Sequence, residues 1–179
     1  MPINLETVKT NLYTWAKSVL PTNYPVIMYY ENAPRPETDY VSIYVTNYGM
    51  IGQDYTPRPQ NDVGNVVQVG DREFTVQLQA YGGNTYDILE SLRYSLQMQT
   101  VLDTLRVNGI VFVQQFPIQD ITELVNSRFE KRGTMDILFR IGQTYGDVLG
   151  SIDTVEIEEQ FLQGNVVVIT ENVTVTIDP

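Results

Sequence analysis

The sequence predicts an α+β fold with an antiparallel or mixed sheet, an N-terminal and a central helix packed on one face, and a C-terminal β-hairpin arm. The first indication is the stretch Glu73–Gln97, where an alternating strand leads through Gly82-Gly83 into an amphipathic helix. Alternating strands are also predicted at Tyr40–Tyr48 and Phe129–Tyr145. Because each of these elements has a single apolar face, they must cover one another.

Residues 3–20 are predicted to form an amphipathic helix, in which apolar residues recur every three or four positions. Asn4 is a candidate N-cap, and Pro21 ends the helix. Val26–Tyr30 is a short strand candidate. The two prolines of residues 31–37 then hold the chain extended before the Tyr40–Tyr48 strand.

The apolar pattern stops between Gly49 and Gly70, where glycines, prolines and polar residues accumulate. We therefore expect a long loop over residues 49–71, with a short ribbon at Val66–Val69. Such a long connection is uncommon inside a compact domain and is usually functional or mobile.

A short helical turn near Val101–Leu105 and an Asn108-Gly109 turn precede the predicted strand Ile110–Phe116. The segment Ile121–Val125 is ambiguous, and Phe129–Tyr145 reads as one long strand. Its core-facing positions are Met135, Ile137, Phe139 and Ile141, whereas Thr134, Asp136 and Arg140 face away.

Two domains are expected, an α+β domain over residues 1–146 and an acidic extension over residues 147–179. The extension contains two β-rich runs, Thr154–Leu162 and Val166–Ile177, which predict a hairpin. No Lys or Arg follows Arg140. The acidic residues of the extension are Asp147, Asp153, Glu156, Glu158, Glu159, Glu171 and Asp178.

The composition argues against an enzyme and against a nucleic-acid binder. The 179 residues carry a formal net charge of -11 and include no cysteine and no histidine. Disulfides, thiolate metal sites and histidine general bases are therefore excluded. An excess of acids repels DNA phosphates. Without Cys and His, we expect no cofactor and no metal. We also expect no membrane contact, because the sequence shows neither a signal peptide nor a long apolar run.

Two patterns could carry chemistry, and both have a simpler explanation. Asp120 with Glu123, or Glu156 with Glu158, could form an acid/base pair, but charges in such runs are usually solvated surface. Gly82-Gly83 precedes a helix yet lacks the spacing of a phosphate-binding loop, so an ordinary turn is favoured.

Tyrosines and one basic cluster are the candidate contact residues. Tyr40 and two further tyrosines alternate on the strand face opposite the apolar residues, and others flank the central helix. Either they form a subunit interface, or the N-terminal helix or the long loop covers them internally. The basic cluster suits contact with an acidic neighbour in a head-to-tail ring. The candidates are Tyr44, Tyr48, Tyr81, Tyr86, Tyr94, Arg128, Lys131 and Arg132.

Three segments in this order resemble the neck or tail terminator proteins of tailed bacteriophages: the Pro-rich turn with its strand, the strand-helix unit, and Phe129–Arg140. The resemblance spans residues 3–145 and leaves the acidic hairpin outside. It implies structural or contact roles for the matching residues, which are Ala33, Pro34, Arg35 and Pro36 of the turn, and Arg132 and Asp136 of the late strand.

The resemblance also implies a function. Six copies would close into a homohexamer ring in the virion, at the junction of neck and tail, after synthesis in the host cytoplasm. The ring would cap the tail tube protein, contact the sheath protein if the tail is contractile, join the head connector or stopper, and let viral DNA pass without specific binding. The alternatives are another virion connector, such as a head-completion stopper or baseplate component, and a carboxylate-dependent hydrolase.

Overall fold

The structure, a computed structural model, describes residues 4–29, 34–57, 65–125, 127–148, 154–163 and 166–176. It divides into one unit of residues 1–55 and 69–144 and a second unit of residues 56–68 and 145–179. The described helices are α1 (Leu5–Val19), α2 (Thr85–Ser95) and α3 (Gln99–Val107). The described strands are β1 (Val26–Met28), β2 (Tyr40–Tyr55), β3 (Asn65–Tyr81), β4 (Ile110–Gln115), β5 (Gln119–Asp120), β6 (Glu123–Val125), β7 (Arg128–Glu130), β8 (Arg132–Val148), β9 (Thr154–Gln163) and β10 (Val166–Thr176).

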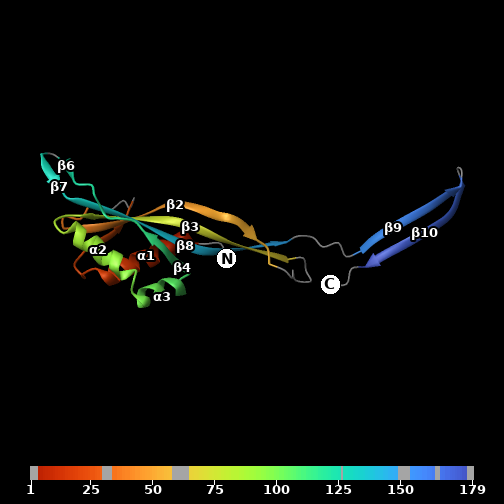
Figure 1. The fold of residues 1–179 in the computed structure, drawn as a ribbon, viewed down its shortest axis with the longest axis horizontal. Helices are drawn as coiled ribbons and strands as arrows, with labels where there is room; N and C mark the ends of the chain where they lie inside the picture. Colours follow the sequence, from red (N-terminus) through yellow and green to blue (C-terminus); the bar gives the residue numbers. More distant parts are fainter. Residues whose placement is uncertain are drawn as a thin grey trace. The chain divides into compact units, whose positions relative to one another are not determined.

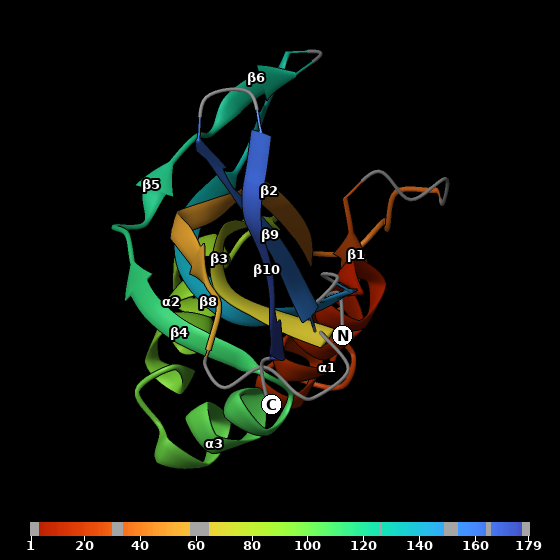
Figure 2. The same ribbon diagram turned by 90° about the vertical axis from the view of Figure 1, so that its right-hand side faces the viewer.

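The main sheet has the strand order β1-β2-β3-β8-β4, with β5 also paired to β8. β1 runs parallel to β2, whereas the β2–β3, β4–β8 and β5–β8 pairs are antiparallel, so the sheet is mixed. The three helices lie on one face of this sheet (Figure 1). Seen along its strands, the sheet is strongly curled (Figure 2). The predicted α+β fold is thus confirmed.

The core lies between the helices and the apolar face of the sheet. The predicted core positions of β8, from Met135 to Ile141, are buried. Phe139 stands at the centre, with ring-centroid distances of 5.8 Å to Phe74, 6.1 Å to Phe112 and 6.3 Å to Trp15. These rings join β3, β4, β8 and α1 in one layer.

The N-terminal helix follows its predicted boundaries closely. The Asn4 side chain accepts a hydrogen bond from the Glu6 amide at 3.0 Å, as expected of an N-cap. The indole nitrogen of Trp15 donates to Ser95 Oγ at 3.1 Å and so connects α1 to the end of α2. None of the described helices is long and apolar enough to cross a membrane.

The predicted loop over residues 49–71 is wrong at both ends. β2 continues to Tyr55, and β3 already begins at Asn65; residues 58–64 lie outside the described residues. The buried Arg72 guanidinium forms two hydrogen bonds of 2.7 Å with the Asp54 carboxylate. Gly70 makes room, since a Cβ there would lie 1.8 Å from Asp54 Oδ1. This ion pair joins β2 to β3 in a part of the two strands, the β2–β3 ribbon, that lacks the apolar alternation of a core strand.

The prediction of one long strand over residues 129–145 is also wrong in one respect, because the strand is interrupted at Lys131, between β7 and β8. β7 pairs with β6 in a separate two-stranded hairpin. Ser127, between the two strands, has a φ of 68°, which lies in the left-handed region that tight turns use. The ambiguous segment Ile121–Val125 thus contributes one strand of this hairpin.

In the second unit, β9 and β10 pair antiparallel from Val166↔Gln163 to Thr176↔Thr154. The predicted hairpin is therefore confirmed as a strand pairing. The domain boundary at residues 146/147 and the role of the hairpin as an arm stay predictions.

A tyrosine–arginine cluster as the candidate functional site

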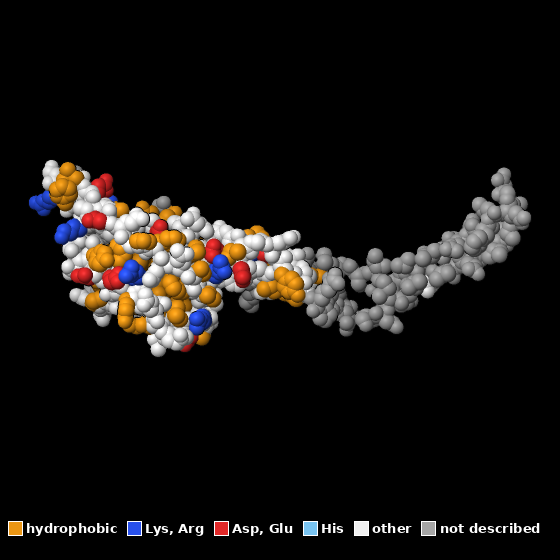
Figure 3. All heavy atoms as spheres, in the orientation of Figure 1, with side chains coloured by type: hydrophobic (Ala, Val, Ile, Leu, Met, Phe, Trp, Pro, Cys, Tyr) orange, Lys and Arg blue, Asp and Glu red, His pale blue; other side chains and the backbone are white. Residues whose placement is uncertain are grey.

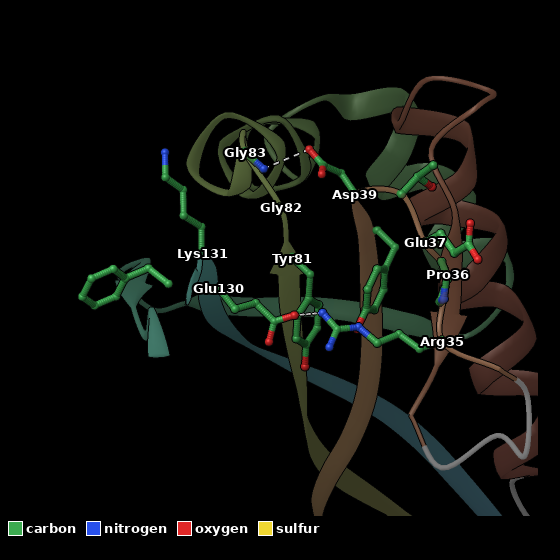
Figure 4. Close-up of a pocket in the computed structure, with 12 residues that line it drawn as sticks. Arg35, Pro36, Glu37, Asp39, Tyr81, Gly82, Gly83, Glu130 and Lys131 are labelled. Atoms are coloured by element: carbon green, nitrogen blue, oxygen red, sulfur yellow. Dashed lines mark hydrogen bonds and ion pairs between the residues drawn. The ribbon is translucent and has the colours of Figure 1, made fainter. Parts of the chain in front are cut away.

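Three chain segments that are distant in sequence meet at one end of the main sheet. They are residues 34–39, the paired ends of β2 and β3, and the passage from β7 to β8. They surround a hollow of about 380 Å³, lined by residues of all three segments (Figure 4). The segments that carry the sequence resemblance thus converge in space.

Two tyrosines form the base of the cluster. Tyr40 and Tyr81 are Cα partners in the β2–β3 register, and their rings stack at 4.4 Å with an interplanar angle of 9°. The guanidinium carbon of Arg35 lies 5.5 Å from the Tyr40 centroid and 5.4 Å from the Tyr81 centroid. That of Arg132 lies 5.3 Å from the Tyr81 centroid. Both arginines therefore make cation–π contacts.

Glu130 joins the two arginines. Its carboxylate forms ion pairs with Arg35 and with Arg132. Arg132 also pairs with Glu123 at 3.0 Å, which ties β8 to β6. Figure 4 shows Arg35 pointing toward Glu130, while Lys131 points away from this ion pair. The contacts connect residues 34–39 to the hairpin through charge and stacking.

Gly82 and Gly83 form the turn between β3 and α2. Gly82 has φ 115°, and a Cβ there would lie 1.9 Å from Asp39 Oδ1. The Gly83 amide donates to Asp39 Oδ2 at 3.0 Å, and the Gly82 amide donates to the Lys131 carbonyl at 3.1 Å. The chain's own carboxylate thus accepts the hydrogen bond of the Gly83 amide, so this donor is not available to a phosphate.

The cluster is suited to contact and not to proton transfer. Burial raises the pKa of Tyr40, and the positive charge of Arg35 offsets part of that rise. Burial, together with the Asp39 carboxylate, raises the pKa of nearby Tyr24 to about 12. These two phenols therefore stay protonated near neutral pH. What the site offers is stacked rings and fixed charge.

The predicted contact residues divide between this cluster and other places. Tyr81, Arg132, Arg35 and Pro36 belong to the cluster or line its hollow, as does Lys131. Arg128 is exposed on β7, and Pro34 is exposed at the start of its segment. Ala33 lies outside the described residues.

The remaining candidate tyrosines lie outside this cluster. The Tyr44 ring packs against Tyr29 with centroids 5.0 Å apart. The Tyr48 hydroxyl donates to Gln143 Oε1 at 3.5 Å. Tyr86 and Tyr94 are 61% and 60% exposed on α2. Whether any of them contacts another subunit stays a prediction.

Sequence reasoning missed the groups that complete the cluster. Tyr40 is buried, and Tyr81 and Arg35 pack against its ring. Glu130 and Asp39 were not singled out. A carboxylate immediately before Tyr40, and another between two cations, were the signals available in the sequence.

The structure gives Asp120 and Glu123 separate partners instead of a shared site. Hydrogen bonds from the Thr122 side chain and amide lower the pKa of Asp120. Glu123 pairs with Arg132. The side chains of Glu156 and Glu158 lie outside the described residues. Among the described residues, no group of three or more acidic side chains could hold a metal ion.

The fold is α+β, and its cluster of stacked rings and ion pairs is of a kind that also forms contacts between proteins. The chain belongs to the phage neck terminator protein family, whose model matches residues 6–165. It is therefore a structural protein of the phage neck, located in the virion. The match extends past the predicted limit at residue 145 and includes β9. No curated protein matches the chain.

Proposed function

We propose that this chain forms a ring at the neck, which caps the tail tube and joins it to the head connector while leaving a channel for DNA. The observation that carries the proposal is the family match over residues 6–165. A ring of six copies is the arrangement that the sequence resemblance implies.

The charge of the chain supports the channel. Each copy carries a formal net charge of -11, and the charges of all copies would add in a ring. An acidic channel wall repels the DNA backbone. DNA would then pass without binding. Partners of the ring would be the tube protein, the connector or stopper, and the sheath protein if the tail is contractile.

A tube-capping assay tests the proposal. Purified tail tubes are incubated with the chain and imaged by negative-stain electron microscopy. We expect added density at one end of each tube and arrested growth when free tube protein is supplied. Density along the whole tube, or unchanged growth with bare ends, would refute the capping role.

A further inference from the structure

The β6–β7 hairpin exposes an apolar surface with a positive charge beside it. We name it the Phe129 surface and define it by Tyr86, Leu124, Phe129 and Lys131. Leu124 and Phe129 are Cα partners, and they are 60% and 76% exposed. Figure 3 shows hydrophobic and basic side chains together at this end of the unit. Exposed apolar patches of this kind mark interaction sites.

The surface is hollowed as well as apolar. Phe129 and Lys131 line both the 380 Å³ hollow of the cluster and a second hollow of about 530 Å³, which Tyr86 also lines. Asp87 and Asp120 border the second hollow. Within the described residues neither Lys131 nor Arg128 forms an ion pair with a carboxylate.

The β9–β10 ribbon has a complementary pattern in its register. Alternate positions of a strand share one face, and one such set contains six apolar residues and two glutamates. The Cα pairs of this set are Val155↔Val175, Ile157↔Val173, Glu159↔Glu171 and Phe161↔Ile169.

This pattern favours a partner. A two-stranded ribbon with one apolar face is marginally stable by itself in water. Like charges at directly opposed positions, as with Glu159 and Glu171, destabilise the pair further. A surface that supplies apolar side chains and a cation would relieve both problems.

We propose that the β9–β10 ribbon of one copy docks on the Phe129 surface of a second copy, where Lys131 meets the opposed Glu159 and Glu171. The inference rests on the proposed function in that copies meet head to tail, so that two different patches form each contact. Charge supports this occupant, because residues 147–179 carry the seven acids named above and no Lys or Arg.

Charge reversal tests the contact in the full chain. Lys131→Glu and Glu159→Lys should each weaken self-association about tenfold, as measured by sedimentation, because each places like charges together. A 1:1 mixture of the two variants should recover wild-type association, since each then offers the charge that the other needs. Arg106→Glu and Asp103→Lys are the controls, as they alter an exposed ion pair on α3.

Cysteine cross-linking identifies the two surfaces directly, because the chain has no cysteine. Phe129→Cys and an isotopically heavy Ile157→Cys chain are mixed and oxidised. We expect a disulfide-linked dimer of mixed mass, and no such dimer when Arg106→Cys replaces Phe129→Cys.

The outcomes separate this inference from the ring. Wild-type-like association of Lys131→Glu, or cross-linking no better than the control, overturns the docking and leaves the ring standing. Specific cross-links without closed rings support the docking and refute the ring. A wild-type chain that neither associates nor cross-links refutes both.

Discussion

At the scale of single residues, the turn between β3 and α2 depends on the absence of a side chain at Gly82. Its φ of 115° is rarely adopted by L-residues, and a Cβ would overlap Asp39. We expect Gly82→Ala to lower the free energy of unfolding by roughly 1–3 kcal/mol, the usual cost of such strain.

Gly83→Ala is the matched control. A Cβ at Gly83 would lie 3.8 Å from Asp39 Oδ2, which is an ordinary contact. Urea unfolding of both variants measures the difference. Equal losses for the two would contradict the proposed role of the Gly82 backbone.

Arg35 contributes through its planar guanidinium as well as its charge. It contacts two rings and the Glu130 carboxylate. Arg35→Lys keeps the charge but loses the planar group, so we expect a loss of about 0.5–1 kcal/mol in unfolding free energy, typical of a partly exposed cation–π contact.

Arg93→Lys serves as the control for Arg35, because Arg93 makes only an i,i+3 ion pair with Glu90 among the contacts described for it. Its unfolding free energy should change little. If Arg35→Lys is as stable as this control, the cluster does not hold residues 34–39 in place.

At the scale of elements, the β2–β3 ribbon depends on Asp54. Its hydrogen bond with Arg72 lowers the pKa of Asp54 below the ordinary value of 3.8. Folding therefore favours the ionised carboxylate, and its contribution to stability is present above that value and is lost as the pH falls through the lower folded-state pKa.

Asp54→Asn tests this dependence. Between neutral pH and about pH 3, wild-type stability should fall more steeply than that of the variant, because only the wild type must protonate this carboxylate. Thermal unfolding across that range measures both slopes, with Asp103→Asn as an exposed control. Parallel curves for wild type and Asp54→Asn would show that the ion pair contributes nothing to the ribbon.

The elements that could be predicted from the sequence are those in which the spacing of apolar residues determines the secondary structure. Phe74 to Ala80 and Met135 to Ile141 alternate strictly, and all these apolar positions are buried. Only Val66–Val69 of the β2–β3 ribbon was predicted, because the Asp54–Arg72 ion pair and the close approach of Asp54 to Gly70 leave no apolar pattern in the sequence.

The cluster was predicted only as separate residues. Arg35, Tyr81 and Arg132 could each be chosen from the sequence. Their meeting depends on the Tyr40↔Tyr81 register and on the path of residues 34–39, which no local pattern encodes. The break at Lys131 likewise depends on the β6–β7 pairing.

At the scale of the whole molecule, one family match and one charge distribution support the proposed ring. The match covers residues 6–165 and so includes the helices, the sheet, the cluster and β9. The basic side chains end at Arg140, and the C-terminal residues are acidic. Two unlike patches on each copy suit a closed, head-to-tail assembly.

The most direct measurement is the rotational symmetry of the assembled protein, determined by electron microscopy of end-on views, alone and on tail tubes. We predict a closed ring of six copies with an open centre. A chain that stays monomeric in both conditions, or that forms open filaments, would contradict it.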